Sequence, residues 1–538
     1  MSDFYITTPI YYVNAPPHLG TLYSTLLADA FYRHRRILRW NLGDKSNGFF
    51  LTGLDEHGQK IERAAHARRM SPEDYCNEMA SKFLDTWGRF SISDNEFIRT
   101  SSRHHKDVVR EAWLDMQAGG DIYLGDHEGL YCVGCESTKT LDETIETRIV
   151  ITDRNIPGFQ DQPRACAIHT TQLVDKVKEK NYFFRLSKYA DRLLDWYKTS
   201  PIDPPEFTNE VRSFVEGGLR DLSISRRNVK WAVAVPGDPE QTIYVWFDAL
   251  MNYITPLGGV EVVRNSAKTY WNDVHHVIGK DILRFHAVYW PAMLMSLGLS
   301  LPKKILCHGF IKVGGDKISK SGPKRIDPND LAAVYGSEAI RYFLLREYPL
   351  GLDGAFTVDM LRKRYEADLS NDLGNLLNRT VVLVNRSLSG KVPARPAVQS
   401  NDEFQAAGDA LLAISAAEGY WDSFRPSKAL EEIWKLIKLA NVYFDKKTPW
   451  RLADAGELDE LEAVLAVVCE MLRRVALLLA PAMPRTSLEI VRQIGRSNDI
   501  EHWSSGSKLE QYVGTVKVFG WPGGTMAHAK PMFPRIAK

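Results

Sequence analysis

The feature that most restricts the fold of this chain is a β-prone run followed by a tight turn and a helical stretch. Residues 4–13 are apolar and β-prone, residues 17–20 are Pro-His-Leu-Gly, and residues 22–36 have apolar side chains at helical spacing. A strand, a turn and a helix N-terminus direct unpaired backbone N–H groups at whatever lies above the strand end. His18 can add a donor there, and Gly20 allows close approach of the backbone. The pattern predicts a phosphate-binding α/β fold.

A second phosphate-binding candidate lies far downstream, in residues 314–322, where glycines flank two lysines and two hydroxyl side chains. Lys317 and Lys320 in such a loop can neutralise charge that develops on a leaving group. Either segment alone is a weak signal, because a histidine in a turn is usually a helix cap or a surface residue, and a lysine loop is usually only solvated. Together, in this order, they indicate a nucleotide-activating enzyme.

The composition is that of a globular chain with several domains. The chain has 538 residues, of which 44% are hydrophobic, and a formal net charge of +1, so no global field indicates nucleic acid. No apolar run approaches the ~20 residues that a transmembrane helix needs. The N-terminus enters a strand almost at once, which predicts no signal peptide. Six cysteines in this length do not make a disulfide framework, so we expect the cytoplasm.

The segment pattern changes several times along the chain. Strand-like and helical segments alternate at first, then short strands and loops surround a cysteine cluster, and strands return at 242–247 and 274–279. After residue 326 the apolar spacing is mainly helical, with long helices predicted at 365–388, 402–420, 426–444 and 458–479. We divide the chain into an α/β domain in two halves (1–115 and 229–325), an insertion (116–228), a connecting region (326–364), a helical domain (365–505) and a C-terminal segment that packs back on the body (506–538).

The insertion contains two pairs of potential metal ligands, each with two intervening residues. Cys132 and Cys135 form the first pair, and Cys166 and His169 form the second. Zn²⁺ favours four tetrahedral nitrogen or sulfur ligands, and four protein ligands make a site structural because no position stays open. The pattern therefore favours one structural Zn²⁺. A redox Cys-x-x-Cys pair or merely buried thiols are the alternatives.

The two phosphate-binding segments resemble the signatures of the class I aminoacyl-tRNA synthetases and, more closely, of the methionyl-tRNA synthetases. The family usually has His-x-Gly-His and Lys-Met-Ser-Lys-Ser. Here Thr21 replaces the second histidine and Ile318 replaces the methionine. Threonine cannot present imidazolium charge to a phosphate, but it can donate one hydrogen bond. The resemblance extends from Tyr5 to Ile536.

The resemblance implies a Rossmann-like catalytic domain with a zinc-knuckle insertion, followed by an α-helical anticodon-binding bundle. It also implies ATP-dependent activation of L-methionine, with Mg²⁺ accompanying ATP, and transfer to tRNA(Met). Because the chain ends without the extra RNA-binding and dimerising domain of some relatives, we expect a monomer with no membrane contact. A related synthetase for another amino acid and a catalytically impaired tRNA-binding paralogue are the alternatives.

Site residues follow by matching family motifs to this sequence. The catalytic set is His18, Thr21, Lys317, Lys320 and Arg226, and the ATP set is His18, Gly20, Thr21, Gly279, Asp281, Ile311 and Lys320. The methionine set is Ile10, Tyr12, Asp55, Trp246, Ala249, Leu250, Tyr253, Ile282 and His286, with Asp55 as acceptor of the ammonium group. The anticodon set is Asn375, Arg379, Arg386, Pro449 and Trp450.

The residues alone leave two of these assignments open. Trp246 lies in a predicted buried strand and Tyr253 follows it, so both could be core, although a thioether pocket needs polarizable aromatic walls. Trp450 could be a buried tryptophan of a helical bundle instead of a platform for an RNA base. The family pattern favours the binding roles in both cases.

Overall fold

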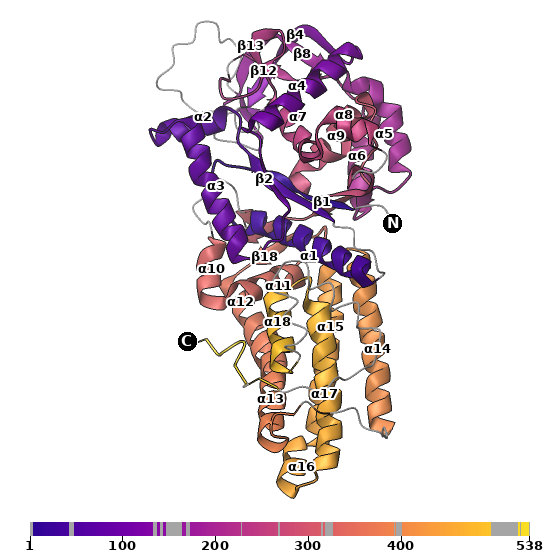
Figure 1. The fold of residues 1–538 in the computed structure, drawn as a ribbon. Helices are drawn as coiled ribbons and strands as arrows, with labels where there is room; N and C mark the ends of the chain where they lie inside the picture. The colour runs from indigo at the N-terminus through magenta and orange to yellow at the C-terminus, as the bar shows by residue number, and fades with distance from the viewer. Residues whose placement is uncertain are drawn as a thin grey trace.

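The structure is a computed structural model of the chain (Figure 1). It describes residues 4–41, 48–132, 137–139, 144–146, 164–167, 173–227, 229–266, 270–313, 316–317, 326–391, 393, 401–495, 526–527 and 529–536. An α/β part occupies one end of the molecule and a bundle of long helices occupies the other (Figure 1). Within the described residues, no helix is long and apolar enough to cross a membrane.

The α/β part is built on a parallel sheet in which strands from distant parts of the chain are neighbours. The strand order is β3-β2-β1-β14-β15-β9. The strands are β1 (Tyr5–Tyr12), β2 (Phe49–Asp55), β3 (Glu96–Arg99), β9 (Ile202–Asp203), β14 (Val274–Gly279) and β15 (Lys304–His308). Tyr5 pairs with Phe49 on one side and with Val274 on the other, all in parallel. The chain therefore leaves β1 in opposite directions, and ligands bind beside such a reversal at the carboxyl ends of the strands.

Helix α1 (Leu19–Asn41) follows the predicted turn, and the predicted apolar positions in residues 22–31 are all buried. Helices α3 (Pro72–Arg89) and α4 (Arg103–Ala118) begin after Ser71 and Ser102, whose hydroxyls accept backbone N–H groups as N-caps.

The predicted strand at 242–247 is wrong in its second half. Strand β13 (Asp238–Ile243) ends early, and residues Val245–Leu250 form the short helix α7. Apolar runs of this length do not separate a strand from a buried helix.

The insertion contains a second, antiparallel sheet with strand order β10-β8-β4-β5. Its long strands are β4 (Ile122–Cys132) and β8 (Asp175–Phe184), flanked by β5 (Ser137–Lys139) and β10 (Leu222–Ser223). Helices α5 (Ala190–Tyr197) and α6 (Glu206–Glu216) lie on either side of β9 in the sequence. Strand β9 pairs with β15, so this part of residues 116–228 extends the parallel sheet.

The helical bundle confirms the predicted change to α-structure. Its helices are α13 (Asn375–Ser387), α14 (Asn401–Asp422), α15 (Pro426–Lys447), α16 (Pro449–Ala455), α17 (Leu458–Leu479) and α18 (Pro484–Gln493), with a π-helical segment, η8 (Tyr365–Gly374), before α13. Residues 526–527 and 529–536 contact this bundle. Asn385 donates to the carbonyl oxygen of Ala527, and Tyr365 donates to the carbonyl oxygen of Pro534 at 2.9 Å.

Helix α1 lies at the junction of the two parts (Figure 1) and contacts α11 (Ser337–Glu347) and α14. The junction is held by Arg341, whose side chain is fully buried. Its guanidinium pairs with Asp29 of α1 at 2.6 Å and donates to the carbonyl oxygens of Phe90, Pro481 and Ala482. A buried charge is tolerated only when it is paired and hydrogen-bonded, so this contact ties the bundle to the helix that begins at the phosphate-binding turn.

Candidate active site

His18 is the N-cap of α1. Its Nδ1 accepts the backbone N–H groups of Gly20 at 3.0 Å and Thr21 at 3.3 Å. In return, the Thr21 hydroxyl accepts the backbone N–H of His18 at 2.9 Å and donates to the His18 carbonyl oxygen at 2.8 Å. This reciprocal arrangement is a capping box in which histidine and threonine take the usual Ser/Thr and Glu/Gln positions.

The capping box determines which His18 nitrogen can act on a ligand. Because Nδ1 is an acceptor for backbone N–H groups, the ring proton belongs on Nε2. The half-buried His18 ring thus presents an Nε2–H donor outside the turn. The Thr21 hydroxyl binds the backbone N–H and carbonyl oxygen of His18, so Thr21 holds the His18 backbone in this turn.

Gly279, Asp281 and Ile311, which are also predicted for ATP, lie at or after the carboxyl ends of the neighbouring strands β14 and β15. Gly279 ends β14, and a Cβ atom built on it would lie 2.7 Å from Oδ1 of Asp281, so a side chain there would crowd this edge. Ile311 begins β16 (Ile311–Val313), which pairs with β17 (Asp316–Lys317) and leads to the lysine loop. The backbone of Lys317 is described, and Lys320 lies outside the described residues.

Asp353 fixes the base of this hairpin. Its carboxylate pairs with Lys280 at 2.6 Å and with Lys312 at 3.0 Å, and it accepts the backbone N–H of Phe310. Burial acts to raise the pKa of Asp353, but the hydrogen bonds from Lys280, Phe310 and Lys312 hold the pKa well below its ordinary value. Two lysines are thereby held beside Gly279 and Ile311.

The residues predicted for methionine come from four segments. Tyr12 pairs with Asp55 in the β1–β2 register, at the carboxyl ends of both strands. Trp246 of α7 stacks on Phe285 with ring centroids 3.6 Å apart. Leu250 and Tyr253 belong to one apolar core, and the partly buried side chains of Ile10, Tyr12, Trp246 and Ile282 pack against it. Ala249 is also buried. Partly exposed aromatic rings over a buried floor can bind an apolar side chain.

Tyr253 and His286 form the buried polar part of this set. His286 Nδ1 lies 3.0 Å from the carbonyl oxygen of Ile282 and must donate to it, so Nε2 accepts the Tyr253 hydroxyl at 2.7 Å. Burial lowers the pKa of His286 to about 4, and burial also raises the pKa of Tyr253. The pair is therefore neutral at pH 7, as a pocket for an uncharged side chain requires.

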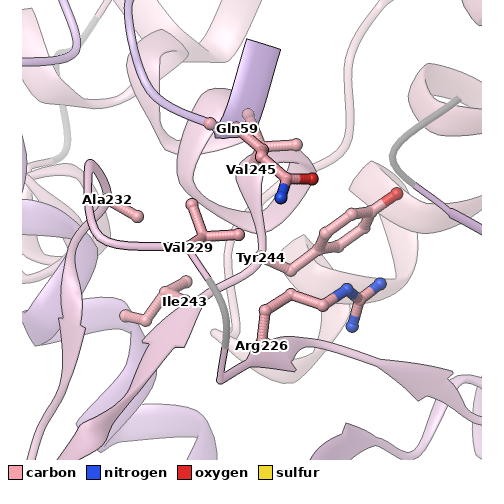
Figure 2. Close-up of a pocket in the computed structure, with 8 residues that line it drawn as sticks. Gln59, Arg226, Val229, Ala232, Ile243, Tyr244 and Val245 are labelled. Atoms are coloured by element: carbon pink, nitrogen blue, oxygen red, sulfur yellow. The ribbon is translucent and has the colours of Figure 1, made fainter. Parts of the chain in front are cut away.

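Arg226 lies in a pocket lined also by Gln59, Val229, Tyr244 and Val245 (Figure 2), and Val245 precedes Trp246 in α7. Its guanidinium carbon lies 4.5 Å from the centroid of the Tyr244 ring. It also donates to the carbonyl oxygens of Ser223 and Ser225. Backbone contacts and a cation–π contact hold the buried guanidinium in one place.

Three buried residues of this region were missed by the sequence analysis. Asp248 of α7 binds His57 at 2.6 Å and His105 at 3.0 Å, and all three side chains are at most 1% exposed. Burial acts to raise the pKa of Asp248, but attraction and hydrogen bonds from the two histidines hold the pKa below its ordinary value. The sequence could have indicated His57, which follows Asp55 at a polar strand end. No motif or spacing in the sequence links His57 to His105 and Asp248, which are far apart along the chain.

The predicted zinc ligands are only half described. Cys132 of β4 and Cys166 of β7 (Arg164–Cys166) are both fully buried and belong to one small apolar cluster with Val174. Cys135 and His169 lie outside the described residues. Among the described residues there is no group of three potential metal ligands. Two buried thiols in one cluster fit half of a tetrahedral site.

The predicted anticodon residues lie on α13 and α16. The guanidinium of Arg379 lies 4.7 Å from the Phe444 ring and 5.3 Å from the Trp450 ring, and it pairs with Asp445 at 2.9 Å. Trp450 is 37% exposed, so it is not a core residue. Pro449 is buried, Asn375 is exposed, and Arg386 pairs with Asp454 at an exposed position instead of joining Arg379.

Comparison with known proteins places this geometry in a family. The model of the family "tRNA synthetases class I (M)" matches residues 4–381. The chain belongs to the class I methionyl-tRNA synthetase family. The methionine–tRNA ligase of Caldanaerobacter subterraneus subsp. tengcongensis is 41% identical over 99% of this chain and 79% of its own length. The methionine–tRNA ligase of Thermosynechococcus vestitus is 42% identical over 92% of this chain and 90% of its own length.

A solved structure agrees with the sequence comparison. Mycobacterium tuberculosis methionyl-tRNA synthetase, in complex with methionyl-adenylate, superposes with a TM-score of 0.89 and 37% sequence identity. The match covers 99% of this chain and 100% of that one. The family's overall fold therefore extends over nearly the whole chain, the helical bundle included.

Proposed function

We propose that this protein is a methionine–tRNA ligase. The carboxylate of L-methionine attacks the α-phosphate of ATP, forming methionyl-adenylate and releasing pyrophosphate. A 3′-terminal ribose hydroxyl of tRNA(Met) then attacks the methionyl carbonyl carbon and releases AMP. The single observation that carries the proposal is the match of residues 4–381 to this family's model. The donor-bearing turn at His18 and the buried, neutral pair of Tyr253 and His286 support it.

Catalysis in this proposal depends on positioning and on stabilising phosphate charge, since the reaction needs no protein nucleophile. His18 donates from Nε2 to a phosphate oxygen while the capping box fixes its ring. Lys317 and Lys320 neutralise the charge on the leaving pyrophosphate, with Mg²⁺ bound to ATP. Asp55 accepts the methionine ammonium group and Arg226 assists from the adjoining pocket.

The remaining assignments are proposals of the same kind. Cys132, Cys135, Cys166 and His169 would hold one structural Zn²⁺, which would fix the tip of the insertion. Arg379 and Trp450 would contact splayed anticodon bases, the tryptophan by stacking. We also keep the domain boundaries given above, a monomeric chain and the cytoplasm, where translation takes place.

The deciding experiment is methionine-dependent exchange of pyrophosphate into ATP, followed by charging of tRNA(Met). We expect exchange with methionine and none of comparable efficiency with leucine, isoleucine, valine or cysteine. Preferred exchange with one of those amino acids would support the related synthetase instead. Absence of exchange, with retained tRNA binding, would identify a catalytically impaired paralogue.

A further inference from the structure

Side-chain and backbone hydrogen bonds hold the chain in place just after the end of β2. Next to Asp55, Glu56 is fully buried, pairs with Arg99 at 2.7 Å and also binds Ser101. The Glu56 backbone N–H binds the Thr100 hydroxyl, and the backbone N–H of Gly58 binds the carbonyl oxygen of Trp231 at 2.9 Å. These contacts fix the end of β2 against residues 99–101 and against Trp231, but none of them reaches α7.

The link to α7 is the Asp248 carboxylate, which binds one histidine with each oxygen. Oδ2 binds His57 Nδ1 at 2.6 Å, two residues beyond Asp55, and Oδ1 binds His105 Nε2 at 3.0 Å. Asp248 itself lies between Trp246 and Ala249. One buried carboxylate thus joins the segment of the proposed ammonium acceptor to the helix of the proposed side-chain pocket.

Asp248 is a carboxylate with two acceptor oxygens, because attraction and hydrogen bonds from the two histidines hold its pKa below the ordinary value. Each oxygen faces one histidine nitrogen, and the other His105 nitrogen lies 3.0 Å from the Thr255 hydroxyl. An amide at position 248 keeps the shape but has one acceptor oxygen and no charge, so it cannot bind both histidines as the carboxylate does.

We propose that Asp248 is a positioning residue that sets the distance between the ammonium-binding and side-chain-binding halves of the methionine pocket, through His57 on one side and α7 on the other. This inference rests on the proposed function, because it takes Asp55 as the ammonium acceptor. The inference goes beyond that function because it names a residue that makes binding depend on both the ammonium group and the side chain of the ligand. A ligand that uses both halves depends on Asp248, and a ligand that uses only one half does not.

The test compares L-methionine with 3-methylthiopropionate, which has the same thioether and carboxylate but no amino group. In Asp248→Asn we expect the KM for methionine in pyrophosphate exchange to rise ~10-fold, the loss expected for one charge-assisted contact. The inhibition constant of 3-methylthiopropionate and the KM for ATP should each change less than ~2-fold. His104→Gln is the matched control, because His104 is exposed and binds the carbonyl oxygen of Thr255, whereas the two oxygens of Asp248 bind His57 and His105.

Parallel weakening of methionine and 3-methylthiopropionate would overturn the proposal, since it would indicate general loosening of the pocket. An unchanged methionine KM in folded Asp248→Asn would overturn it as well. If Asp248→Asn does not fold, His57→Ala and His57→Asn replace it. The asparagine of His57→Asn places an amide N–H near the position of Nδ1 in the wild-type histidine. We therefore expect His57→Ala to raise the KM for methionine and His57→Asn to keep it near the wild-type value. Failure of the proposed function is distinct, because wild-type protein would then show no methionine-dependent exchange.

Discussion

The capping box at His18 predicts a measurable role for a residue that departs from the family signature. In Thr21→Val the side-chain shape is retained, but the hydroxyl that binds both backbone groups of His18 is lost. These bonds are 2.9 and 2.8 Å long and half-buried, and a net hydrogen bond contributes ~0.5–1.5 kcal/mol. The His18 side chain keeps its own bonds to the backbone N–H groups of Gly20 and Thr21, so only the Thr21 half of the capping box is lost. We therefore expect the productive orientation of His18 to lose about 1–2 kcal/mol.

The lost free energy should appear as a lower rate of adenylate formation, because His18 is proposed to bind phosphate charge that develops in the transition state. A change of about 1–2 kcal/mol is a factor of about 5–30. The turnover number of methionine-dependent pyrophosphate exchange should fall by this factor in Thr21→Val, with a methionine KM within ~2-fold of wild type, since uniform binding is not affected. Pre-steady-state formation of methionyl-adenylate measures the same step directly.

Thr21→Ser is the matched control, because serine keeps the hydroxyl and removes only a methyl group. It should retain most of the wild-type rate. Equal losses in the serine and valine variants would show that the methyl group matters rather than the capping box. An unchanged rate in Thr21→Val would refute the reasoning altogether, because His18 would then hold its orientation without Thr21.

Four further predictions concern other parts of the molecule. Lys320→Ala should lower adenylate formation at least ~10²-fold with little change in methionine affinity, and near-normal exchange kinetics would contradict its role. Freshly purified protein should contain about one zinc per chain by metal analysis, lost in Cys132→Ser with local loosening rather than global unfolding. Trp450→Ala should weaken tRNA binding by ~1–3 kcal/mol and leave pyrophosphate exchange normal, whereas a joint loss would make Trp450 structural. Burial lowers the pKa of His286 to about 4 from an ordinary 6.5, so the unfolded chain binds a proton that the native chain does not. The free energy of unfolding should therefore fall as pH drops through that range, by about 3 kcal/mol more in wild type than in His286→Gln, measured by chemical denaturation.

The sequence by itself determined the local elements, because their signals are local. The β-prone run, the turn at His18 and helix α1 occur where the pattern predicted them, and so do the long helices of the bundle. The family signatures determined which class of reaction to expect, since each is a short segment with its own chemistry. The prediction of a strand at 242–247 was wrong in its second half, where the structure has helix α7. Local sequence does not distinguish a short buried strand from a short buried helix.

Only the tertiary structure decided how distant residues act on one another. It showed that the His18 ring caps its own helix, so that Nε2 is the donor and Thr21 is its support. It also brought Asp248 between His57 and His105, residues that no motif or spacing connects. The physical reason is that hydrogen-bond partners and desolvation depend on which chain segments pack together, and a parallel sheet joins strands that are far apart in the sequence.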